Sequence, residues 1–374
     1  MRILYINHST YIAGGEISLS QLINYCQTMG IEMYILLPQQ GKFSEMLNKY
    51  NIKTFYLKLE YKRNRYLRIF FYLIYSFKLC KFLLKKNIDL VHANSLRSSI
   101  DNALGAKLAR VKIIGHIRDI RLLGGKSIFL LNLLTIIIAN SAATKKHLLK
   151  EGVKGKKIKI IYNGVDLNNY DYLKSPDVFR KKYHIKSCVP LIGIIGQLCE
   201  RKGIIFFIEA AKKLSERMPK TTYIVVGDDL LNKGKYRQKM EAMVKRFGLE
   251  QKFIFTGFVK EIPEVMAAID ILILASLQEP FGRVVIEAMA MKKPVIATKV
   301  GGVSEIVLNG ESGFLIPPSD SDAIANKAFV LLKDKKLAKI MGERGRCRVE
   351  KYFTIQQNIE NITALYKDIL ESRL

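Results

Sequence analysis

Tryptophan is absent from this sequence of 374 residues, proline occurs only nine times, and acidic side chains are scarce. The 33 Asp and Glu residues face 61 Lys and Arg residues, so the formal net charge is +28. Hydrophobic residues nevertheless make up 49% of the chain, which excludes a disordered polycation and supplies material for packed cores. Because single cores stop growing beyond roughly 250–300 residues, we expect two domains.

Closely spaced cysteine pairs are also missing. The five cysteines stand singly along the chain, at Cys26, Cys80, Cys188, Cys199 and Cys347. An odd number without a C-x-x-C pair predicts a reducing compartment, with neither disulfides nor a zinc site. The first residues, MRILYINHST, contain no apolar run of the length that a secretory signal needs. Export is therefore not expected, and a cytoplasmic location is.

Uncharged runs suited to crossing a membrane are lacking as well. The run between Lys126 and Lys145 comes near the roughly 20 apolar residues that a spanning helix needs. Polar side chains such as Asn132 and Asn140 interrupt it, and its TIIIA segment is β-branched. We interpret this run as a helix followed by a buried parallel strand.

Residues 61–86, YKRNRYLRIFFYLIYSFKLCKFLLKK, combine aromatic and aliphatic side chains with many cations. The uncharged centre, residues 69–77, is too short to span a bilayer. Two interpretations stay open: a helix in an anionic membrane interface, or a surface helix packed on its own sheet. The overall charge is uneven too. Residues 1–186 hold 32 basic and 11 acidic residues, a net +21, whereas residues 187–374 hold 29 and 22, a net +7.

Short apolar runs alternate with helical patterns through both halves of the chain. Such alternation predicts parallel sheets flanked by helices, and right-handed crossovers make each half a Rossmann-like, doubly wound α/β domain. We expect a first domain over residues 1–180, a second over 187–350, and a C-terminal helix over 351–374 packing back on the first. The expected strands are residues 2–7, 32–37, 54–57, 90–93, 112–116, 136–139, 191–195, 222–226, 253–256, 271–274, 294–297 and 313–316.

Ligands of open α/β sheets bind outside the carboxyl ends of the strands, where turns lead into helix N-termini. After the first strand comes NHSTYIAGGE, in which Gly14 and Gly15 would let backbone amides approach a phosphate or a sugar. An ordinary tight turn explains them equally well. The GxGxxG fingerprint is not present, and no acidic ribose-binding residue follows the second strand, which argues against a nicotinamide dehydrogenase.

Two further strand ends carry candidate side chains. His116 and Asp119 close the expected strand 112–116, where they could orient a sugar or assist proton movement, although a lone histidine is more often structural. In the second half, Arg201 and Lys202 stand at the start of a helix. Two cations beside the positive end of a helix dipole suit a diphosphate leaving group, and a solvated charge pair is the alternative.

The strongest signal is SLQEPFGRVVIEAMAMKKPVIAT, directly after the expected strand 271–274. Its loop holds Glu279, Phe281 and Gly282 close to helix N-terminal amides, which suits a neutral polyol beside a diphosphate. Glu287 follows two turns into the next helix, where a carboxylate can accept paired hydrogen bonds from ribose hydroxyls. Charge, proline, glycine and spacing coincide here in a way that an ordinary strand-loop-helix unit does not require.

Acidic pairs that resemble metal motifs have simpler explanations. The D-x-D sequence at residues 320–322 follows two prolines and opens a helix, so N-capping by Ser319 or Asp320 accounts for it. Asp228 and Asp229 follow the expected strand 222–226 and are interpreted as loop residues. No metal site is expected.

Taken together, these motifs resemble family 4 of the retaining glycosyltransferases. Members have the GT-B architecture, two Rossmann-like domains facing a cleft, and include bacterial polysaccharide and lipopolysaccharide enzymes. The resemblance covers nearly the whole chain and is specific for the family but not for the substrate. It is carried by GGE, HIRD, ANSAATKKHL, IYNGVD, RKG, VVGDD, FTGF, EPFG with the glutamate that follows it, and the final YFT helix.

The resemblance implies a role for each residue of the second-half site. Arg201 and Lys202 would hold the donor diphosphate and neutralise the charge that develops as the sugar-phosphate bond breaks. Glu279 would bind sugar hydroxyls, with the backbone of Phe281 and Gly282 nearby.

The remaining candidates follow in the same way. Glu287 would hold the ribose hydroxyls of the donor. Gly14 and Gly15 would face its phosphates from the first domain, and His116 would sit over the sugar. One departure concerns Gln197, where many relatives have arginine, so that diphosphate binding would rest more heavily on the two cations named above.

Chemistry and partners are implied as well. Transfer would keep the anomeric configuration through front-face attack, an oxocarbenium-like state and a leaving phosphate that takes the acceptor proton, without a metal. A UDP- or GDP-sugar would be the donor, as substrate and not as cofactor. The acceptor would be a glycan or lipid-linked glycan at the inner face of a bacterial plasma membrane, and an anionic membrane surface would be a partner of residues 61–86.

Two other functions remain as alternatives. A sugar-nucleotide epimerase can have the same architecture and would need no acceptor. A nucleic-acid-binding protein would suit the charge of +28. However, the aromatic residues cluster in one apolar run and no base-reading motif is present, so no nucleic-acid partner is expected.

Overall fold

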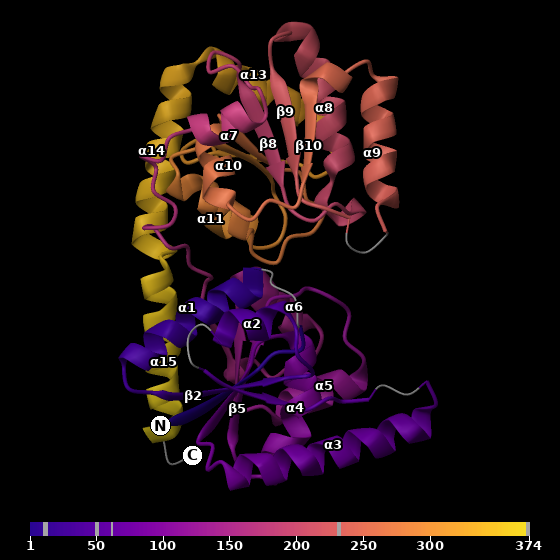
Figure 1. Ribbon diagram of the computed structural model, residues 1–374, viewed down its shortest axis with the longest axis vertical. Helices are drawn as coiled ribbons and strands as arrows, with labels where there is room; N and C mark the ends of the chain where they lie inside the picture. Colours follow the sequence, from indigo (N-terminus) through magenta and orange to yellow (C-terminus); the bar gives the residue numbers. More distant parts are fainter. Residues whose placement is uncertain (10–13, 49–51, 61–62, 230–232, 372–374) are drawn as a thin grey trace. The chain divides into compact units, whose positions relative to one another are not determined.

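The computed structural model describes residues 1–9, 14–48, 52–60, 63–229 and 233–371, which form two α/β units (Figure 1). Unit 1 comprises Met1–Asn163 and Ile355–Leu374, and unit 2 comprises Gly164–Thr354. Each contains one parallel sheet with helices on both faces. The fold class predicted from the sequence, two Rossmann-like parallel-sheet domains, is thereby confirmed.

Unit 1 contains a seven-stranded sheet in the order β3-β2-β1-β4-β5-β6-β7. Its central strands are mostly apolar because both faces are covered, with His92 in β4 and His116 in β5 as buried polar exceptions. In β1, Ile3 and Tyr5 point into one core while Leu4 and Ile6 point into the other, as the two-residue period of a strand requires. The strands are β1 (Arg2–Ile6), β2 (Glu32–Leu37), β3 (Lys53–Tyr56), β4 (Leu90–Ala93), β5 (Lys112–Ile117), β6 (Ile136–Ala139) and β7 (Ile158–Ile160).

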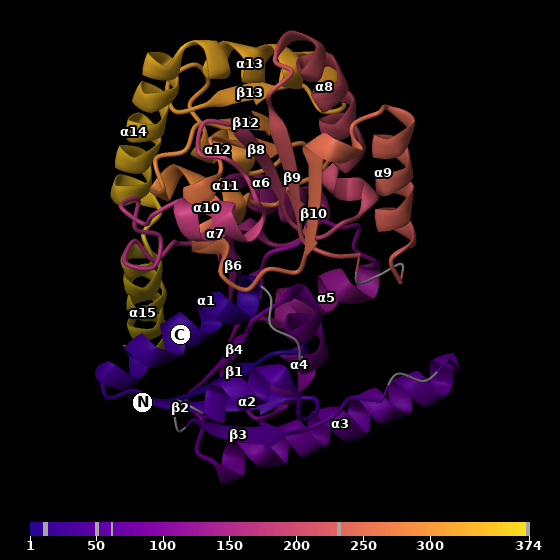
Figure 2. The same cartoon turned by 45° about the horizontal axis from the view of Figure 1, so that its top comes forward.

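Helices α1, α2 and α15 cover one face of this sheet, and α3, α4 and α5 cover the other. The last helix, α15, lies against α1 although the two are far apart in sequence (Figures 1 and 2). Its residues Ile359, Ile362 and Tyr366 are buried in the core of unit 1. The helices are α1 (Gly14–Thr28), α2 (Lys42–Asn48), α3 (Arg65–Lys85), α4 (Leu96–Leu108), α5 (Gly125–Leu133), α6 (Ala142–Lys150), η1 (Gly155–Lys157) and α15 (Ile355–Glu371).

Unit 2 contains a six-stranded sheet in the order β10-β9-β8-β11-β12-β13. Chain order reverses at β8, which pairs with β9 on one side and β11 on the other. Ligands of doubly wound sheets bind beyond the strand ends at such a switch point. The strands are β8 (Leu191–Ile195), β9 (Thr222–Val226), β10 (Phe253–Gly257), β11 (Ile271–Leu274), β12 (Val295–Thr298) and β13 (Phe314–Ile316).

The helices of unit 2 connect these strands. They are α7 (Asp177–Lys182), η2 (Glu200–Lys202), α8 (Ile204–Arg217), α9 (Lys235–Arg246), η3 (Glu250–Lys252), α10 (Ile262–Ala268), α11 (Arg283–Ala290), α12 (Val303–Ile306), α13 (Ser321–Lys333) and α14 (Lys335–Tyr352).

The division between the units lies earlier in the chain than the boundary expected between residues 180 and 187. Unit 2 begins at Gly164, whereas the sequence led us to expect the first domain to extend to residue 180. The reason is visible at α7, where buried Arg180 donates from Nε to the carbonyl of Ala268 at 3.0 Å and from Nη2 to Asp270 at 2.9 Å. These contacts attach the segment to unit 2. Polar turn residues do not reveal such attachments.

Every strand expected from the sequence is present, with ends that differ by one residue at most. The additional strand β7 was not expected, because its three residues, IKI, are too few to show a period. The uncharged run after Lys126 forms helix α5 and strand β6, which confirms its interpretation as a helix followed by a buried parallel strand. None of the helices among the described residues is long and apolar enough to cross a membrane.

Candidate functional site

Two loops in unit 2 carry most of the predicted site residues. One follows β8 and leads through η2 into α8, and the other follows β11 and leads into α11. Because β8 and β11 pair directly, their carboxyl ends are neighbours, and side chains distant in sequence meet there. This edge of the sheet is the switch point at which the strand order predicts a ligand.

Lys202 and Glu279 form the central ion pair of this edge. Lys202 Nζ lies 2.7 Å from Glu279 Oε2, although the residues are 77 positions apart. Their side chains are 17% and 11% exposed, so water screens the pair only partly. Ser276 Oγ donates a further hydrogen bond to the same carboxylate oxygen at 3.2 Å. The carboxylate is therefore held by two donors, and the ammonium group is held near the solvent-facing edge.

Arg201 connects the two loops through its backbone and its side chain. Its Nη1 donates to the carbonyl of Gln278 at 3.0 Å, and its carbonyl accepts from the amide of Leu277 at 2.8 Å. The side chain is exposed, so its remaining N–H groups face solvent. Both predicted cations are thus fixed at the same strand edge as the predicted carboxylate.

Glycine allows these loops to approach one another closely. Gly203 has φ +64°, and a β-carbon there would lie 2.0 Å from the carbonyl oxygen of Ala275. Gly301 has φ +51°, and a β-carbon there would lie 1.9 Å from the carbonyl oxygen of Glu279. The same carbonyl accepts a hydrogen bond from Gly302 N at 3.1 Å. The loops after β8, β11 and β12 therefore pack backbone against backbone, which fixes the position of Glu279.

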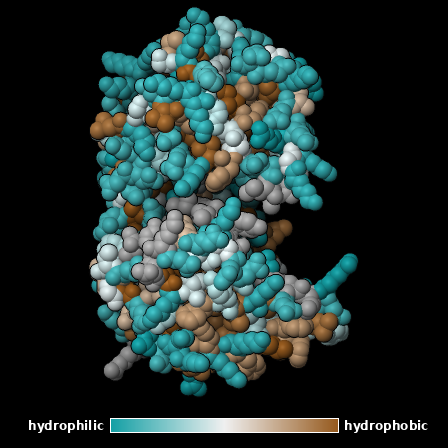
Figure 3. Space-filling view, in the orientation of Figure 1, coloured by the Kyte–Doolittle hydropathy of each residue, from teal (hydrophilic) through white to brown (hydrophobic). Residues whose placement is uncertain are grey.

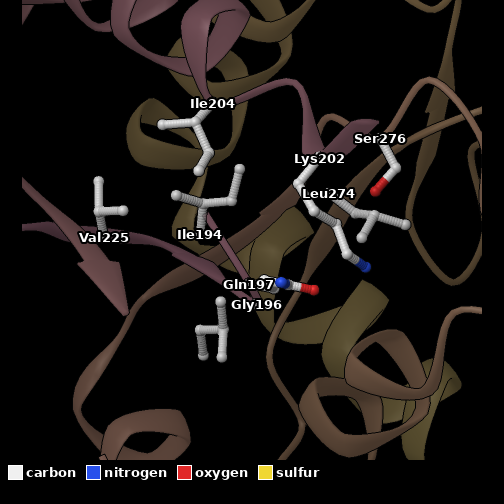
Figure 4. Close-up of a pocket in the computed structure, with 9 residues that line it drawn as sticks. Ile194, Gly196, Gln197, Lys202, Ile204, Val225, Leu274 and Ser276 are labelled. Carbon is white, nitrogen blue, oxygen red and sulfur yellow. The ribbon is translucent and has the colours of Figure 1, made fainter. Parts of the chain in front are cut away.

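A small pocket lies beside this pair and is lined in part by Gly196 and Gln197. Figure 4 shows Lys202, Leu274 and Ser276 on one side of it and Val225 on the other. Gln197 is an uncharged member of this lining. Its uncharged amide leaves Lys202 as the cation that lines the pocket.

Glu287 lies in α11 and is buried. Arg283 Nε donates to its Oε1 at 2.8 Å, and Tyr170 forms a side-chain hydrogen bond to the same carboxyl group. Burial raises the pKa of Glu287, although both partners act to lower it. Sequence reasoning missed Tyr170, because a tyrosine in a polar turn carries no distinctive signal.

The loop residues Phe281 and Gly282 complete this side of the site. The ring of Phe281 is buried and meets Phe353 edge to face, with ring centroids 5.9 Å apart. Gly282, with φ +102°, immediately precedes α11. The aromatic ring thus anchors the loop from beneath, and only backbone atoms of these two residues are available to a ligand at the helix N-terminus.

The predicted residues of unit 1 occupy the carboxyl ends of β1 and β5. Gly14 and Gly15 open α1, and residues 10–13 before them lie outside the described part of the chain. Beside them, Asn7 Nδ2 donates to Glu16 Oε1 at 2.9 Å.

His116 is buried in β5 with an exposed fraction of 1%. Its Nδ1 lies 3.2 Å from Arg118 Nη2 and 3.3 Å from Nε2 of His92 in the neighbouring strand β4. Burial and the nearby Arg118 hold the pKa of His116 well below its usual value, so the imidazole is neutral. Asp119 does not join this group, because it pairs with Arg121 at 3.0 Å on the surface. Sequence reasoning missed His92, which lies inside an ordinary apolar strand.

The acidic pairs have structural roles. Asp320 is the N-cap of α13 and accepts from Ala323 N at 2.8 Å, which confirms the capping interpretation. Asp322 pairs with Lys213 at 2.7 Å, and Asp229 accepts from Tyr236 N at 2.7 Å. Within the described ranges, no group of three or more His, Cys, Asp and Glu side chains is placed to hold a metal ion.

Comparison with known families agrees with this geometry. The family model for glycosyl transferases group 1 matches residues 176–348, and the model for glycosyltransferase family 4 matches residues 12–169. Together the two matches span most of both units. The chain belongs to the family 4 glycosyltransferases.

Curated relatives of this glycosyltransferase include a galactosyltransferase and a synthase. It is 26% identical to the UDP-Gal:alpha-D-GlcNAc-diphosphoundecaprenol alpha-1,3-galactosyltransferase of Escherichia coli, over 96% of this chain and 97% of that protein. It is 28% identical to the N-acetyl-alpha-D-glucosaminyl L-malate synthase of Bacillus anthracis, over 78% of each chain. These relatives give no support to the epimerase or nucleic-acid alternatives.

Solved structures of similar proteins establish the architecture. Anabaena HepE, solved in complex with UDP and glucose, matches with a TM-score of 0.86 and 26% identity over 98% of this chain and 99% of that one. A glycosyltransferase from Rickettsia africae matches with a TM-score of 0.88, also at 26% identity, over 99% of each chain. The protein is accordingly a nucleotide-sugar-dependent glycosyltransferase with the GT-B fold.

Proposed function

We propose that this glycosyltransferase moves a hexose from a UDP- or GDP-sugar to a lipid-linked glycan during cell-surface polysaccharide synthesis. Transfer retains the anomeric configuration, needs no metal and takes place at the inner face of the bacterial plasma membrane. The observation that carries the proposal is the Lys202–Glu279 pair, held beside Arg201 at the switch point of unit 2.

The pair suits a donor that is anionic at one end and neutral at the other. Lys202 and Arg201, together with the amides at the start of α11, would neutralise the diphosphate as it departs. Glu279 keeps an acceptor-only carboxylate available for sugar hydroxyls. Because the glycine contacts fix both groups before the donor binds, little reorganisation is needed during the reaction.

Proton transfer needs no further side chain in this scheme. The acceptor hydroxyl attacks the anomeric carbon from the side that the leaving phosphate vacates, and a phosphate oxygen takes the hydroxyl proton. The bond from the anomeric carbon to the phosphate oxygen breaks as the new glycosidic bond forms. The role of the protein is to position the reactants and to stabilise the charge of the departing diphosphate.

Glu287 would accept both ribose hydroxyls of the donor. Arg283 and Tyr170 already hold its carboxyl group in place, and its raised pKa reflects the burial that a ribose would complete. Gly14 and Gly15 at the start of α1 would contribute amides to the donor phosphates. The E. coli relative uses UDP-galactose and an undecaprenol-linked acceptor, and HepE binds UDP, which supports a uridine donor and a lipid-linked acceptor here.

Transfer of radiolabel from a panel of nucleotide sugars into membrane lipid tests this function. Glu279→Ala is expected to lose at least about a hundredfold in rate. Lys213→Ala is the matched control, because it removes a lysine that pairs with Asp322 away from the site. Equal transfer by the native chain and Glu279→Ala would contradict the catalytic proposal.

Two further measurements test metal independence and retention of the anomeric configuration. Activity in excess EDTA should equal activity without it, and a loss restored by a divalent cation would overturn metal independence. NMR of the product linkage should show the donor's anomeric configuration, and inversion would overturn retention.

The membrane part of the proposal rests on helix α3. Its inner face, with Tyr75 and Leu79, is buried against unit 1, which the surface-helix interpretation requires. Its outer face also carries large apolar side chains, namely Tyr66, Phe70 and Phe77, which are 81%, 57% and 57% exposed. These lie at intervals of four and seven residues and therefore share one side of the helix. Figure 3 shows apolar side chains at the end of the molecule where Figure 1 draws α3.

An anionic lipid surface is the occupant that the charges favour. Helix α3 contains no acidic residue, and its exposed cations include Arg68, Lys78 and Lys81. A second copy of so basic a helix would be repelled, whereas anionic headgroups attract each lysine or arginine by about 1 kcal/mol. The apolar side chains would enter the acyl boundary between these cations.

Flotation with lipid vesicles tests this partner. The full chain should float with phosphatidylglycerol vesicles and not with phosphatidylcholine vesicles. Phe70→Asn combined with Phe77→Asn should abolish flotation, whereas Phe258→Asn, which removes a phenylalanine that is 72% exposed in unit 2, should not. Equal flotation with neutral vesicles, or a dimer that the α3 variants abolish, would overturn the anionic-membrane proposal.

A further inference from the structure

A continuous chain of buried polar side chains crosses unit 1 from β5 to α15. Arg118 Nη2 lies 3.2 Å from His116 Nδ1, which lies 3.3 Å from His92 Nε2. His92 Nδ1 lies 2.6 Å from the hydroxyl of Tyr366, and that hydroxyl is hydrogen-bonded to the hydroxyl of Tyr5. The His92 ring also stacks on Tyr5 with centroids 4.7 Å apart.

The direction of each hydrogen bond in this chain follows from one group. A guanidinium can only donate, so His116 Nδ1 must accept from Arg118 and carries no proton. Nε2 of His92 faces the same lone pair and must therefore donate to it. A neutral imidazole that donates from one nitrogen accepts at the other, so His92 Nδ1 accepts from the Tyr366 hydroxyl. The Tyr366 oxygen in turn accepts from Tyr5.

The second ring nitrogen of His116, Nε2, lies outside this series of hydrogen bonds. Since Nδ1 carries no proton, the neutral ring carries its proton on Nε2. This atom is buried and has no hydrogen-bond partner within the described part of the chain. A buried N–H without an acceptor is costly and rare in folded proteins, and this one lies in the last residues of β5, at the strand end where open α/β sheets bind ligands.

We propose that His92, Tyr366 and Arg118 are positioning residues that hold His116 in its Nε2–H tautomer, so that Nε2 donates a hydrogen bond to an oxygen of the sugar substrate. The inference rests on the proposed function for the identity of that oxygen. It adds a role for α15, which supplies Tyr366 to a network that otherwise belongs to the sheet.

The electrostatic surroundings support a neutral pair of histidines. Burial and Arg118 lower the pKa of His92 to about 3, and they lower that of His116 as well. If Tyr366 lost its hydroxyl, His92 Nδ1 would be left as a buried acceptor without a donor. The His92 tautomer would then be held from the His116 side alone, so the form protonated on Nδ1 would gain population, although it sets two lone pairs, at His92 Nε2 and His116 Nδ1, against each other.

Nitrogen NMR of the full chain labelled with ¹⁵N-histidine tests the tautomers directly. His116 should show a protonated Nε2 and an unprotonated Nδ1, and His116→Asn identifies its signals. His92 should show the same tautomer in the native chain and a mixture of both tautomers in Tyr366→Phe. A native His116 that is protonated on Nδ1, or a His92 pattern that Tyr366→Phe leaves unchanged, would overturn the proposal whether or not a substrate is known.

Kinetics of donor turnover test the consequence. Tyr366→Phe should lower kcat about three- to tenfold while the donor KM changes less than about twofold, because one orienting hydrogen bond is lost. Tyr223→Phe is the matched control. It removes a buried hydroxyl, bonded to Ser215 and the carbonyl of Ala211 in unit 2, and should leave kcat unchanged. Equal losses in both variants would indicate general destabilisation and overturn the positioning role.

A conservative replacement of His92 separates positioning from packing. Gln can accept at its oxygen and donate from its nitrogen, so His92→Gln should retain more activity than His92→Leu.

Calorimetry with UDP distinguishes this inference from the proposed function. If the native chain binds UDP and Tyr366→Phe binds it equally, a loss of kcat belongs to the network. If the native chain does not bind UDP or GDP, the proposed donor fails while the tautomer result stands.

Discussion

The two units share one architecture and use opposite kinds of polar chemistry. In unit 2, the candidate site is an ion pair on loops, Lys202 with Glu279, supported by glycines that let three backbones touch. In unit 1, the corresponding strand ends carry a neutral chain of imidazole and phenol groups inside the sheet. A fold therefore does not dictate the chemistry at its strand ends. Charges remain on partly exposed loops, where water and ligands reduce their cost, and neutral groups occupy the interior.

The two units also differ in their charge. Helix α3 of unit 1 has cations on its exposed face, and it has large apolar side chains on its buried face and on its exposed face. Residues 164–354, which form unit 2, hold 32 basic and 22 acidic residues, a net +10, whereas the rest of the chain holds 29 and 11, a net +18. The larger excess on unit 1 fits the lipid surface proposed for α3, and the candidate site of unit 2 uses two cations for the proposed donor.

The largest effect is expected from breaking the ion pair of unit 2. Lys202→Met should lower kcat by about 10²–10³, because the departing diphosphate loses its partly buried counter-charge and Glu279 loses its partner. If the two side chains act as a unit, the double variant with Glu279→Gln should be little worse than the worse single variant. A double-mutant cycle measured by donor turnover checks this. Strictly additive losses would show that the residues act independently.

The next effect concerns the backbone contact beneath that pair. Gly301→Ala would place a β-carbon 1.9 Å from the carbonyl of Glu279, so the loop must move, at a cost of about 3 kcal/mol or more in unfolding free energy. Gly248→Ala is the control. Its φ of +68° is similar, but nothing lies within 4 Å of the added carbon, so only about 1 kcal/mol is expected. Urea unfolding followed by circular dichroism compares the two, and equal losses would remove the steric explanation.

A smaller effect distinguishes the interior of unit 1. The pKa of His92 falls from 6.5 when unfolded to about 3 when folded, so below pH 6.5 the unfolded chain binds the extra proton. Stability of unit 1 should therefore fall as pH drops through this window, by about 1.4 kcal/mol per pH unit from His92 alone. Hydrogen exchange, corrected for intrinsic rates, should show that unit 1 opens more at pH 5.5 than at pH 7. The buried polar residues of the described chain include no histidine in unit 2.

His92→Phe provides the control for that pH dependence. The phenyl ring can still stack on Tyr5 but cannot titrate. The stability that unit 1 loses per pH unit should therefore decrease by about 1.4 kcal/mol, which is the contribution of His92. An unchanged slope would assign the sensitivity to other groups.

The smallest effect is expected at the surface of α3. Lys81→Ala should weaken binding to phosphatidylglycerol vesicles about fivefold, since each cation near an anionic surface contributes about 1 kcal/mol. Lys220→Ala, an exposed lysine of unit 2, should leave binding unchanged. Vesicle titrations at low and high salt provide the measurement. Equal weakening by both variants would indicate attraction to net charge alone.

Much of the candidate site was predictable because its signals are local. Arg201, Lys202 and Glu279 each lie in the connection after an apolar strand, and the parallel arrangement of strands makes the strand ends converge. The N-cap at Asp320 was predictable for the same reason, since a cap depends on the three residues after it. The role of α3 was left undecided by its sequence, because apolar residues on both faces fit burial and lipid equally well.

Other features depend on contacts that no local pattern encodes. His92 and Tyr366 are 274 positions apart, and neither has a distinctive neighbourhood in the sequence. Tyr170 reaches Glu287 from the segment that enters unit 2, and Arg180 attaches that segment to the same unit. A hydrogen bond between distant residues requires both elements to be placed, and placement depends on packing of the whole core.

Sequence alone therefore predicted the fold class, every strand except β7, the family, and the charged groups that meet at the strand ends of unit 2. The physical reason is that the spacing of apolar residues, the glycine turns and the strand ends each depend on residues close together in the sequence. Only the tertiary structure decided which charges pair, which face of α3 stays exposed, and how His116 is oriented by a helix from the end of the chain. These depend on distances between elements, which chain packing sets and no short pattern of residues contains.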